Sequence, residues 1–383
     1  RGREVPHMTP GLLCRLATVA LVLVLSPLHH GSTRPPALLP KAEVFLGLLG
    51  WMGLDGPPGV SADGGKPRAS QEFYTIGFPL TTSLSSTSDV YAGIIRYLNV
   101  TVGPQFDPPI YFKHINIEAG VADAMNLEQA LQANMLDFWL GSTLDVVCFE
   151  GQYPSRVLGS ITRWDLESWP LEELSGYGGL FVVRNDSDVR SIEDMRGKVI
   201  ASEVASATEG LSGGLLQWRE MLSRGISLTD DTKAVVWISG GPFAMGELLI
   251  ERKIDVALMR TSMLEFFYQS GQIGQNDWRA VEGGVQKWKG STFPRVSSTP
   301  IVPEWALSVL DWVDSDVSKA VLESLLKLSW IDPVWGWVLP GTLIYRFGSP
   351  ANHASTRSML EDVGIMVVDP VTLQRRCKRG YNA

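Results

Sequence analysis

The chain has 383 residues, of which 45% are hydrophobic and 19% charged, and its formal net charge is -8. A chain of this length and composition can bury the cores of two ordinary domains, which excludes an intrinsically disordered protein. A nucleic-acid-binding surface needs a basic stripe, and no segment supplies one. We therefore expect a globular protein with no nucleic-acid partner.

Residues 1–70 do not have the pattern of a folded domain. The apolar run LATVALVLVL follows Arg15, and this layout predicts a signal peptide or a signal anchor over residues 1–30. Residues 31–70 are rich in Pro and Gly, which predicts a linker. We expect a secreted or extracellular protein, tethered to a membrane if the apolar segment is kept or if a C-terminal region beyond this sequence holds an anchor.

The cysteines and two short motifs bear on the same location. Cys14 lies in the predicted leader, so Cys148 and Cys377 remain to form a disulfide, and a buried free Cys148 is an equally good interpretation. The ending CKRGYNA resembles the start of a small Cys-rich repeat, which predicts a truncated repeat at 377–383. Sequons at Asn99 and Asn185 agree with a glycoprotein, although such triplets also arise by chance.

From residue 73 the chain alternates strand and helix patterns. Apolar runs predict strands at 73–80, 110–118, 136–140 and 157–167, and helical spacing predicts helices at 89–100, at 126–135 and from 143. This alternation indicates an α/β unit with a largely parallel sheet, whose ligands gather at the carboxyl ends of the strands. The hydroxyl side chains expected at those ends are Thr82, Ser83, Ser142 and Thr143, and the alternative for each is a surface hydroxyl with no role.

A second α/β unit follows from residue 178. Strands are predicted at 178–186, 198–202, 234–239, 254–260 and 278–284, and helices at 212–226, 243–253 and 261–271. The chain then reads FPRVSSTPIVPEW, in which the prolines exclude a helix and favour an extended return crossing.

This succession resembles the phosphate, phosphite and phosphonate family of ABC-transporter substrate-binding proteins, and especially the sensor domains of tetrathionate-sensing histidine kinases. The matching features, in order, are GGLFVVRNDS before SIEDMRGK, a GG pair opening a helix, IDVALMRTSMLE, and FP followed by ST and PEW. The resemblance implies a type II periplasmic-binding fold: two α/β lobes joined by two extended hinge crossings, with a ligand cleft between them. It implies a first lobe at 71–178, a second lobe at 179–292, and a return crossing with the rest of the first lobe at 293–376.

Candidate ligand contacts in the second unit carry open alternatives. Ser212, Gly213 and Gly214 are expected at a helix N-terminus, where they either contact an anion or permit tight helix packing. Arg260, beside Thr261 at a strand end, either holds an oxyanion or pairs with Glu265 or another local acid. Arg184 is expected at the crossing, reaching the ligand or pinning the hinge.

No set of residues predicts an enzyme. Only two histidines follow the leader, His114 and His353, and neither lies in a catalytic motif. No phosphate loop, HExxH motif or Cys/His cluster occurs, so no cofactor or metal is expected. We expect an ABC-transporter-like solute-binding or sensor domain that closes on a small anion, with a membrane receptor or transporter component as partner. The alternative is a receptor ectodomain that uses the fold as a protein-interaction module without a ligand.

Overall fold

The computed structural model describes residues 69–80, 91–118, 127–165, 172–203, 210–238, 241–274, 276–329, 332, 338, 344–370 and 375–377. All of them belong to one compact unit, Asp63–Ala383. The predicted signal segment, nearly all of the predicted linker, and the predicted contacts Thr82 and Ser83 lie outside the described residues.

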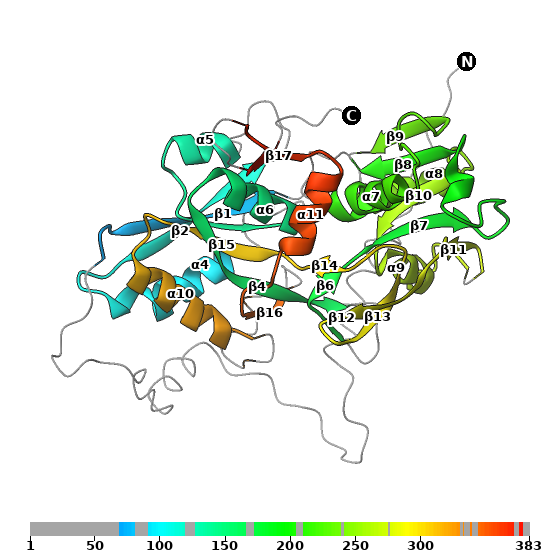
Figure 1. The fold of residues 1–383 in the computed structure, drawn as a ribbon. Coiled ribbons are helices and arrows are strands. Elements are labelled where there is room, and N and C mark those ends of the chain that lie inside the picture. The colour runs from blue at the N-terminus through cyan, green and yellow to red at the C-terminus, as the bar shows by residue number, and fades with distance from the viewer. Residues whose placement is uncertain are drawn as a thin grey trace, which may run out of the picture. The chain divides into compact units, whose positions relative to one another are not determined.

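The first sheet has the strand order β16-β4-β15-β3-β1-β2, with β5 added beside β4 (Figure 1). Only β1, β2 and β3 pair in parallel, whereas β15 and β16 run antiparallel to their neighbours. The predicted largely parallel sheet is therefore wrong for half of this sheet, because β15 and β16 return to it from a distant part of the chain. The strands are β1 (Phe73–Leu80), β2 (Tyr111–Glu118), β3 (Phe138–Gly141), β4 (Ser155–Asp165), β5 (Glu172–Leu174), β15 (Ala306–Leu310) and β16 (Ile344–Gly348).

Helices of amphipathic pattern pack against this sheet. In α10, Val317, Val321 and Leu325 recur every four residues and are buried, which gives the helix one apolar face. This face joins α4 and strand β1 in a single apolar core. The helical elements of this part are α4 (Ala92–Thr101), η1 (Gly103–Gln105), α5 (Leu127–Gln132), α6 (Thr143–Gln152) and α10 (Ser315–Lys327).

The second sheet has the order β11-β7-β10-β8-β9. Its central strand β10 is buried from Val256 to Met259, which agrees with the apolar run in the sequence. The strands are β7 (Gly179–Arg184), β8 (Val199–Glu203), β9 (Ala234–Ile238), β10 (Val256–Arg260) and β11 (Trp278–Ala280), followed by the hairpin β12 (Gly284–Trp288) and β13 (Ser291–Ser297). The helical elements are η2 (Glu193–Met195), η3 (Leu211–Leu215), α7 (Leu216–Ser223), α8 (Gly241–Ile250) and α9 (Met263–Gln269).

Two short strands connect the sheets, as the extended crossings of the sequence predict. Strand β6 (Gly176–Tyr177) leads into β7, and β14 (Val302–Pro303) leads back toward β15. The two pair antiparallel, with Val302 opposite Tyr177 (Figure 1). The predicted lobe boundaries at 71–178, 179–292 and 293–376 stay predictions.

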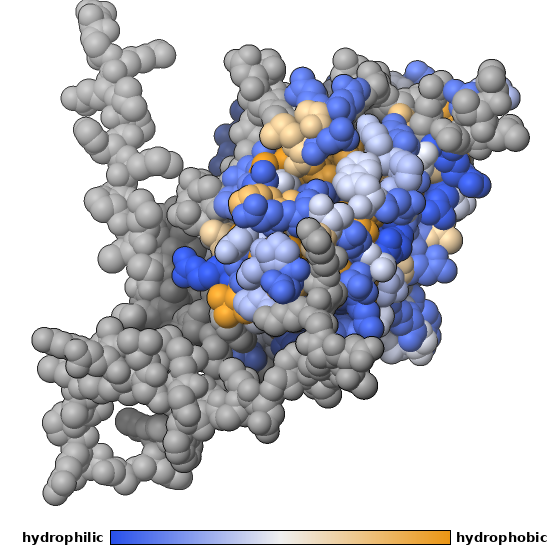
Figure 2. All heavy atoms as spheres, turned by 90° about the vertical axis from the view of Figure 1, so that its left-hand side faces the viewer, coloured by the Kyte–Doolittle hydropathy of each residue, from blue (hydrophilic) through white to orange (hydrophobic). Residues whose placement is uncertain are grey.

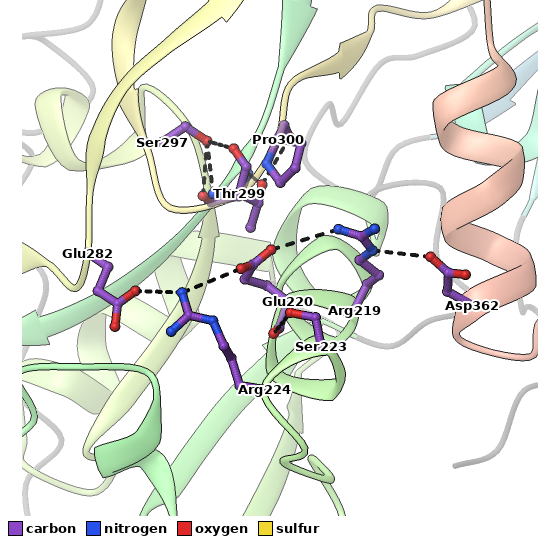
Figure 3. A network of polar contacts seen from close by, with 10 residues as sticks. Arg219, Glu220, Ser223, Arg224, Glu282, Ser297, Thr299, Pro300 and Asp362 are labelled. Atoms are coloured by element: carbon purple, nitrogen blue, oxygen red, sulfur yellow. Dashed lines mark hydrogen bonds and ion pairs between the residues drawn. The ribbon is translucent and has the colours of Figure 1, made fainter.

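The C-terminal segment contacts helices from both halves of the fold. It consists of α11 (Ala354–Asp362), β17 (Met366–Val368) and β18 (Arg375–Cys377). Its apolar residues share one buried cluster with α6 and with η3 and α7. Figure 3 shows Arg219 of α7 directed toward Asp362 at the end of α11, with 3.3 Å between Nε and Oδ2. The segment therefore links the two halves of the fold beside the crossing.

A disulfide joins Cys148 of α6 to Cys377 of β18, 229 residues apart in sequence. Of the two interpretations left open by the sequence, the bridge is thus the one observed. Cys377 is 9% exposed and belongs to the apolar cluster around α11. Residues 378–383 lie outside the described residues, so the predicted Cys-rich repeat at 377–383 stays a prediction.

One face of the surface and the character of the helices can be described. In Figure 2 hydrophilic side chains predominate on the coloured part of the face, and hydrophobic ones occur in small groups. Within the described ranges, no helix combines the length and the apolar character that crossing a membrane requires.

Candidate ligand site at the crossing between the sheets

The glycine pair that leads from β6 into β7 is held by several hydrogen bonds. Thr261 contacts Gly178 twice: its hydroxyl accepts from the Gly178 N–H at 3.2 Å, and its own N–H donates to the Gly178 carbonyl at 3.0 Å. A Cβ on Gly178 would overlap the Ser297 hydroxyl oxygen, so a larger residue there would require Ser297 to move. The Gly179 N–H donates to the hydroxyl of Thr299 at 2.8 Å. The predicted contact Thr261 therefore lies at the crossing, where its hydroxyl holds the backbone.

Two arginines from different sheets share one buried carboxylate beside this crossing. Glu304 stands between β14 and β15 and its side chain is 0% exposed. Arg260, the last residue of β10, pairs with Glu304 Oε1, and Arg163 of β4 lies 3.5 Å from Oε2 through its Nε. Because the three groups carry two positive charges and one negative charge, the cluster keeps one net positive charge.

Aromatic rings cover both guanidinium groups. Arg260 lies 4.4 Å from the ring centre of Tyr177, and Arg163 lies 4.8 Å from that of Trp305. Such stacking suits arginine, whose planar cation is weakly hydrated. The rings therefore shield part of each guanidinium group, and the side chains of Arg163 and Arg260 remain 19% and 25% exposed.

Burial also acts on the ionisable groups of the site. Desolvation lowers the pKa of Arg163, while attraction to Glu304 opposes the shift and repulsion from Arg260 adds to it. Burial, reinforced by Glu304, raises the pKa of Tyr177 above its usual range, so its phenol stays neutral. The charges available to a ligand are therefore those of the two arginines and the glutamate.

A second buried ion pair continues along the same strand. Asp165 lies two residues after Arg163 on β4, so both side chains share one face of the strand. Asp165 pairs with Arg295 of β13. Burial raises the pKa of Glu265 in α9, and the charge of Arg295 opposes that shift. The sequence suggested Glu265 or another local acid as the partner of Arg260. In the structure Glu265 lies near Arg295, and Arg260 pairs with Glu304.

Ser142 and Thr143 have separate places in the structure. The Ser142 side chain caps α6: its hydroxyl donates to Asp145 at 2.7 Å and accepts from the Asp145 N–H at 3.3 Å. Burial raises the pKa of Asp145 to about 6, and the bonds that its carboxylate accepts from the Ser142 hydroxyl and the Ser142 backbone N–H oppose this shift. The Thr143 hydroxyl donates to the Pro303 carbonyl at 2.5 Å, next to Glu304. Thr143 therefore belongs to the crossing, whereas the Ser142 hydroxyl stabilises the helix start.

The glycine turn before α7 is packed against a carboxylate of the protein itself. Ser212, Gly213 and Gly214 lie within η3, and all three are buried. A Cβ on Gly213 would lie 2.2 Å from Glu203 Oε2, and one on Gly214 would lie 2.7 Å from the Ser202 hydroxyl oxygen. Tight packing, the simpler of the two interpretations, accounts for both glycines, and anion contact at this turn stays a prediction.

Arg184 does not lie at the crossing, and that prediction is wrong. Strand β7 begins at the crossing, with Gly179 opposite Arg260, and runs away from it. Arg184 ends the strand five residues later, about 16 Å farther on at the usual rise per residue. There its guanidinium donates to the carbonyls of Leu249 and Ile254 at 3.3 and 3.0 Å. Arg184 therefore holds α8 against the far end of the sheet.

Arg163, Glu304 and Tyr177 belong to the site but were not predicted from the sequence. Arg163 is a charged residue inside the strand SITRWD, whose preceding residues are buried, and Glu304 stands between Pro303 and Trp305. Two features of the sequence could have indicated them: the charge of Arg163 within a strand, and the acidic Glu304 between apolar residues of the crossing. Within the described ranges, no group of three or more His, Cys, Asp or Glu residues could hold a metal ion.

Comparison with known proteins finds one family and many similar folds. The sequence pattern of the family described as ABC transporter, phosphonate, periplasmic substrate-binding protein matches residues 114–374. The tetrathionate sensor histidine kinase TtrS of Salmonella typhimurium is 22% identical over 242 residues, which cover 63% of this chain. They cover 37% of TtrS, so the chain spans well under half of that relative.

Solved structures match over most of the chain. XAC2383 from Xanthomonas citri, bound to ATP, has a TM-score of 0.57 at 19% identity, covering 76% of this chain and 96% of that one. PhnD1 from Prochlorococcus marinus, in complex with methylphosphonate, has a TM-score of 0.54 at 13% identity, covering 76% of this chain and 98% of that one. These similarities confirm the predicted α/β fold of type II periplasmic-binding proteins.

Proposed function

Because this chain belongs to the family of periplasmic substrate-binding proteins of phosphonate ABC transporters, we propose that it is a solute-binding or sensor domain that closes on a small anion at the crossing. The observation that carries the proposal is the meeting of Arg163 and Arg260, one from each sheet, at Glu304. A ligand held by both arginines would join the two halves of the fold. Its contacts would then favour the closed arrangement over an open one.

The ligand class follows from the chemistry of these side chains. Guanidinium groups bind phosphonate, phosphate and sulfur oxyanions through paired hydrogen bonds, which are stronger when the site is shielded from water. The cluster keeps one positive charge after Glu304 is counted, which suits a small anion. We include Thr143, Thr261 and the turn at Ser212, Gly213 and Gly214 as contributors to the same site, and we keep Thr82 and Ser83, which lie outside the described residues, as contacts predicted from the sequence.

The disulfide supports a location outside the reducing cytosol. Bridges of this kind form and persist in oxidising compartments. Together with the apolar segment at 16–25, the Cys148–Cys377 bridge supports a secreted protein whose N-terminal 30 residues direct export. A membrane receptor or a transporter component would receive the ligand or the signal. The name of the sensor kinase relative suits signalling, and the family name suits transport.

One feature favours a second function. The Glu304 carboxylate already lies between the two arginines, where an anionic ligand would bind. Because Glu304 already neutralises part of the charge of the two arginines, the site gains less from binding an anion. The alternative is therefore a receptor ectodomain that keeps the fold as a protein-interaction module.

A thermal-shift screen of the full chain separates the two functions. The compounds are phosphate, phosphite, methylphosphonate, sulfate, tetrathionate, amino acids and small carboxylates. A ligand at 100 times its dissociation constant stabilises the folded state by about 2.7 kcal/mol, which raises the melting temperature by several degrees. The variants are Arg260→Ala and, as a matched control from the same sheet, Arg184→Ala.

We expect one class of anion to raise the melting temperature of the natural protein and of Arg184→Ala, and not that of Arg260→Ala. A rise that survives in Arg260→Ala would place the ligand elsewhere on the protein. No rise with any compound would favour the interaction module.

A further inference from the structure

We propose that Asn185 carries an N-linked glycan and that Asn99, the other sequon asparagine in the described part of the chain, does not. The inference rests on the secretory location proposed above. Both triplets, Asn99-Val-Thr and Asn185-Asp-Ser, satisfy the acceptor rule, so the sequence alone does not distinguish them. Their surroundings in the folded protein do.

The amide of Asn99 is part of the sheet edge. Among the described strands, β2 is the last one of the first sheet, and no described strand pairs with its outer side. Asn99 of α4 fills this position at Phe112: its Nδ2 donates to the Phe112 carbonyl at 3.0 Å, and its Oδ1 accepts from the Phe112 N–H at 2.6 Å. An unpaired strand edge is costly when partly buried, so this amide has a structural role.

The rest of the first sequon is engaged as well. The Thr101 hydroxyl donates to the Tyr97 carbonyl at 2.8 Å and lies 2.6 Å from the hydroxyl of Ser324 in α10. A sugar on Asn99 Nδ2 would have to leave the protein between α4 and β2, where that nitrogen already contacts a backbone carbonyl. The folded structure therefore opposes a glycan at Asn99.

Asn185 has the opposite surroundings. It lies in the turn directly after β7 and is exposed, and its backbone N–H donates to the Asp277 carbonyl at 2.7 Å. Among the described residues, its side-chain amide makes no hydrogen bond or ion pair. It borders a hollow of about 510 Å³, whose rim includes Arg252 and Trp278. The backbone of Asn185 is thus held in place by a hydrogen bond. Its side-chain Nδ2 has no hydrogen-bond partner among the described residues and lies beside open space for the first sugar.

The modification itself is an ordinary group transfer. Asn185 Nδ2 forms a bond to C1 of the first sugar, the bond from C1 to the pyrophosphate oxygen of a polyisoprenyl-pyrophosphate oligosaccharide breaks, and one amide proton is released. The donor is present in the secretory pathway of eukaryotic cells, which the test below uses, and the product is a bulky, solubilising group on the surface. No group on the protein is oxidised or reduced.

The test is expression of the full chain in eukaryotic cells, once with its own N-terminal segment and once behind a heterologous secretion signal. Glycans are counted by the mass lost on treatment with a peptide-N-glycosidase, which converts a glycosylated asparagine to aspartate. The variants are Asn185→Gln, which removes the proposed site, and Thr101→Ala, which removes the first sequon and leaves the Asn99 amide in place.

We expect the protein secreted by the heterologous signal to carry one glycan, with aspartate found at position 185 after treatment. Asn185→Gln should lose the whole mass shift, and Thr101→Ala should keep it. A secreted protein without a glycan, or with a glycan on Asn99, would overturn the inference. The glycan could appear with the heterologous signal while the chain's own N-terminal segment does not direct secretion of the protein. That result would support the glycosylation site and contradict the proposed secretory location.

Discussion

Replacing both Cys148 and Cys377 by alanine removes a crosslink that closes most of the described chain. The bridge joins residues 229 apart. In the chain-entropy account a crosslink restricts the unfolded ensemble, and a loop of this length corresponds to about 5 kcal/mol at 25 °C. Measured values commonly fall below this figure, so we expect the free energy of unfolding to drop by roughly 2–5 kcal/mol.

Without the disulfide, unfolding should begin at the C-terminal hairpin of β17 and β18. Strand β18 pairs only with β17 in the described structure, and the disulfide fastens it to α6. The apolar cluster around α11, which includes Leu360 and Met366, remains in the double variant. We therefore expect a folded protein that is less stable and has a more easily opened C-terminal segment.

Equilibrium unfolding in urea measures the effect. The natural protein and the double variant are each unfolded with and without a reductant, and Cys14 is present in both. Reductant should lower the midpoint of the natural protein to near that of the variant and leave the variant unchanged. The reasoning is refuted if the double variant is within about 1 kcal/mol of the natural protein, well below the typical effect of a native disulfide.

Four further substitutions each change one residue of the fold. Glu304→Gln removes the buried carboxylate from two arginines whose side chains are 19% and 25% exposed, so urea unfolding should show a loss of about 1.5–3 kcal/mol, the usual size for hydrogen bonds to charged groups, and a loss under about 1 kcal/mol would contradict the shared ion pair. Burial lowers the pKa of His353 from 6.5 to about 4, so the fold favours its neutral form, and the contribution of this histidine to stability, present above pH 6.5, should fall by about 3 kcal/mol as the pH drops to 4. Because the raised pKa of Asp145 acts in the opposite direction over much of this range, the quantity to measure is the difference between His353→Gln and the natural protein: the variant should lose about 3 kcal/mol less on going from pH 6.5 to 4, and equal slopes would exclude the histidine as the cause. Gly213→Ala places a methyl group 2.2 Å from Glu203 Oε2 and should cost about 1–3 kcal/mol in thermal unfolding, whereas Gly284→Ala, with nothing within 4 Å, should be nearly neutral. Equal melting temperatures for these two variants would show that the glutamate side chain moves aside freely.

In the candidate site, the strand that positions Arg260 is predictable from the sequence, and its ion-pair partner is not. The apolar run before Arg260 correctly predicts a strand that ends at this residue, because burial of consecutive side chains leaves a clear pattern. Its partner Glu304 lies 44 residues away, and no local pattern joins the two. Arg184 also ends a predicted strand, but the antiparallel direction of that strand beside β10 carries it away from the crossing. Strand direction within a sheet depends on pairing with distant strands, which the local pattern does not contain.

By itself the sequence determined the order and type of most elements, the two extended crossings and, through ordered motifs, the family. These properties follow from short-range periodicity, turn residues and prolines, which act within a few residues along the chain. Only the tertiary structure decided the Cys148–Cys377 bridge, the antiparallel return of β15 and β16, and the meeting of Arg163 and Arg260 at one carboxylate. Each of these is a contact between segments far apart in sequence, and it forms because burying the apolar faces of both sheets brings those segments together.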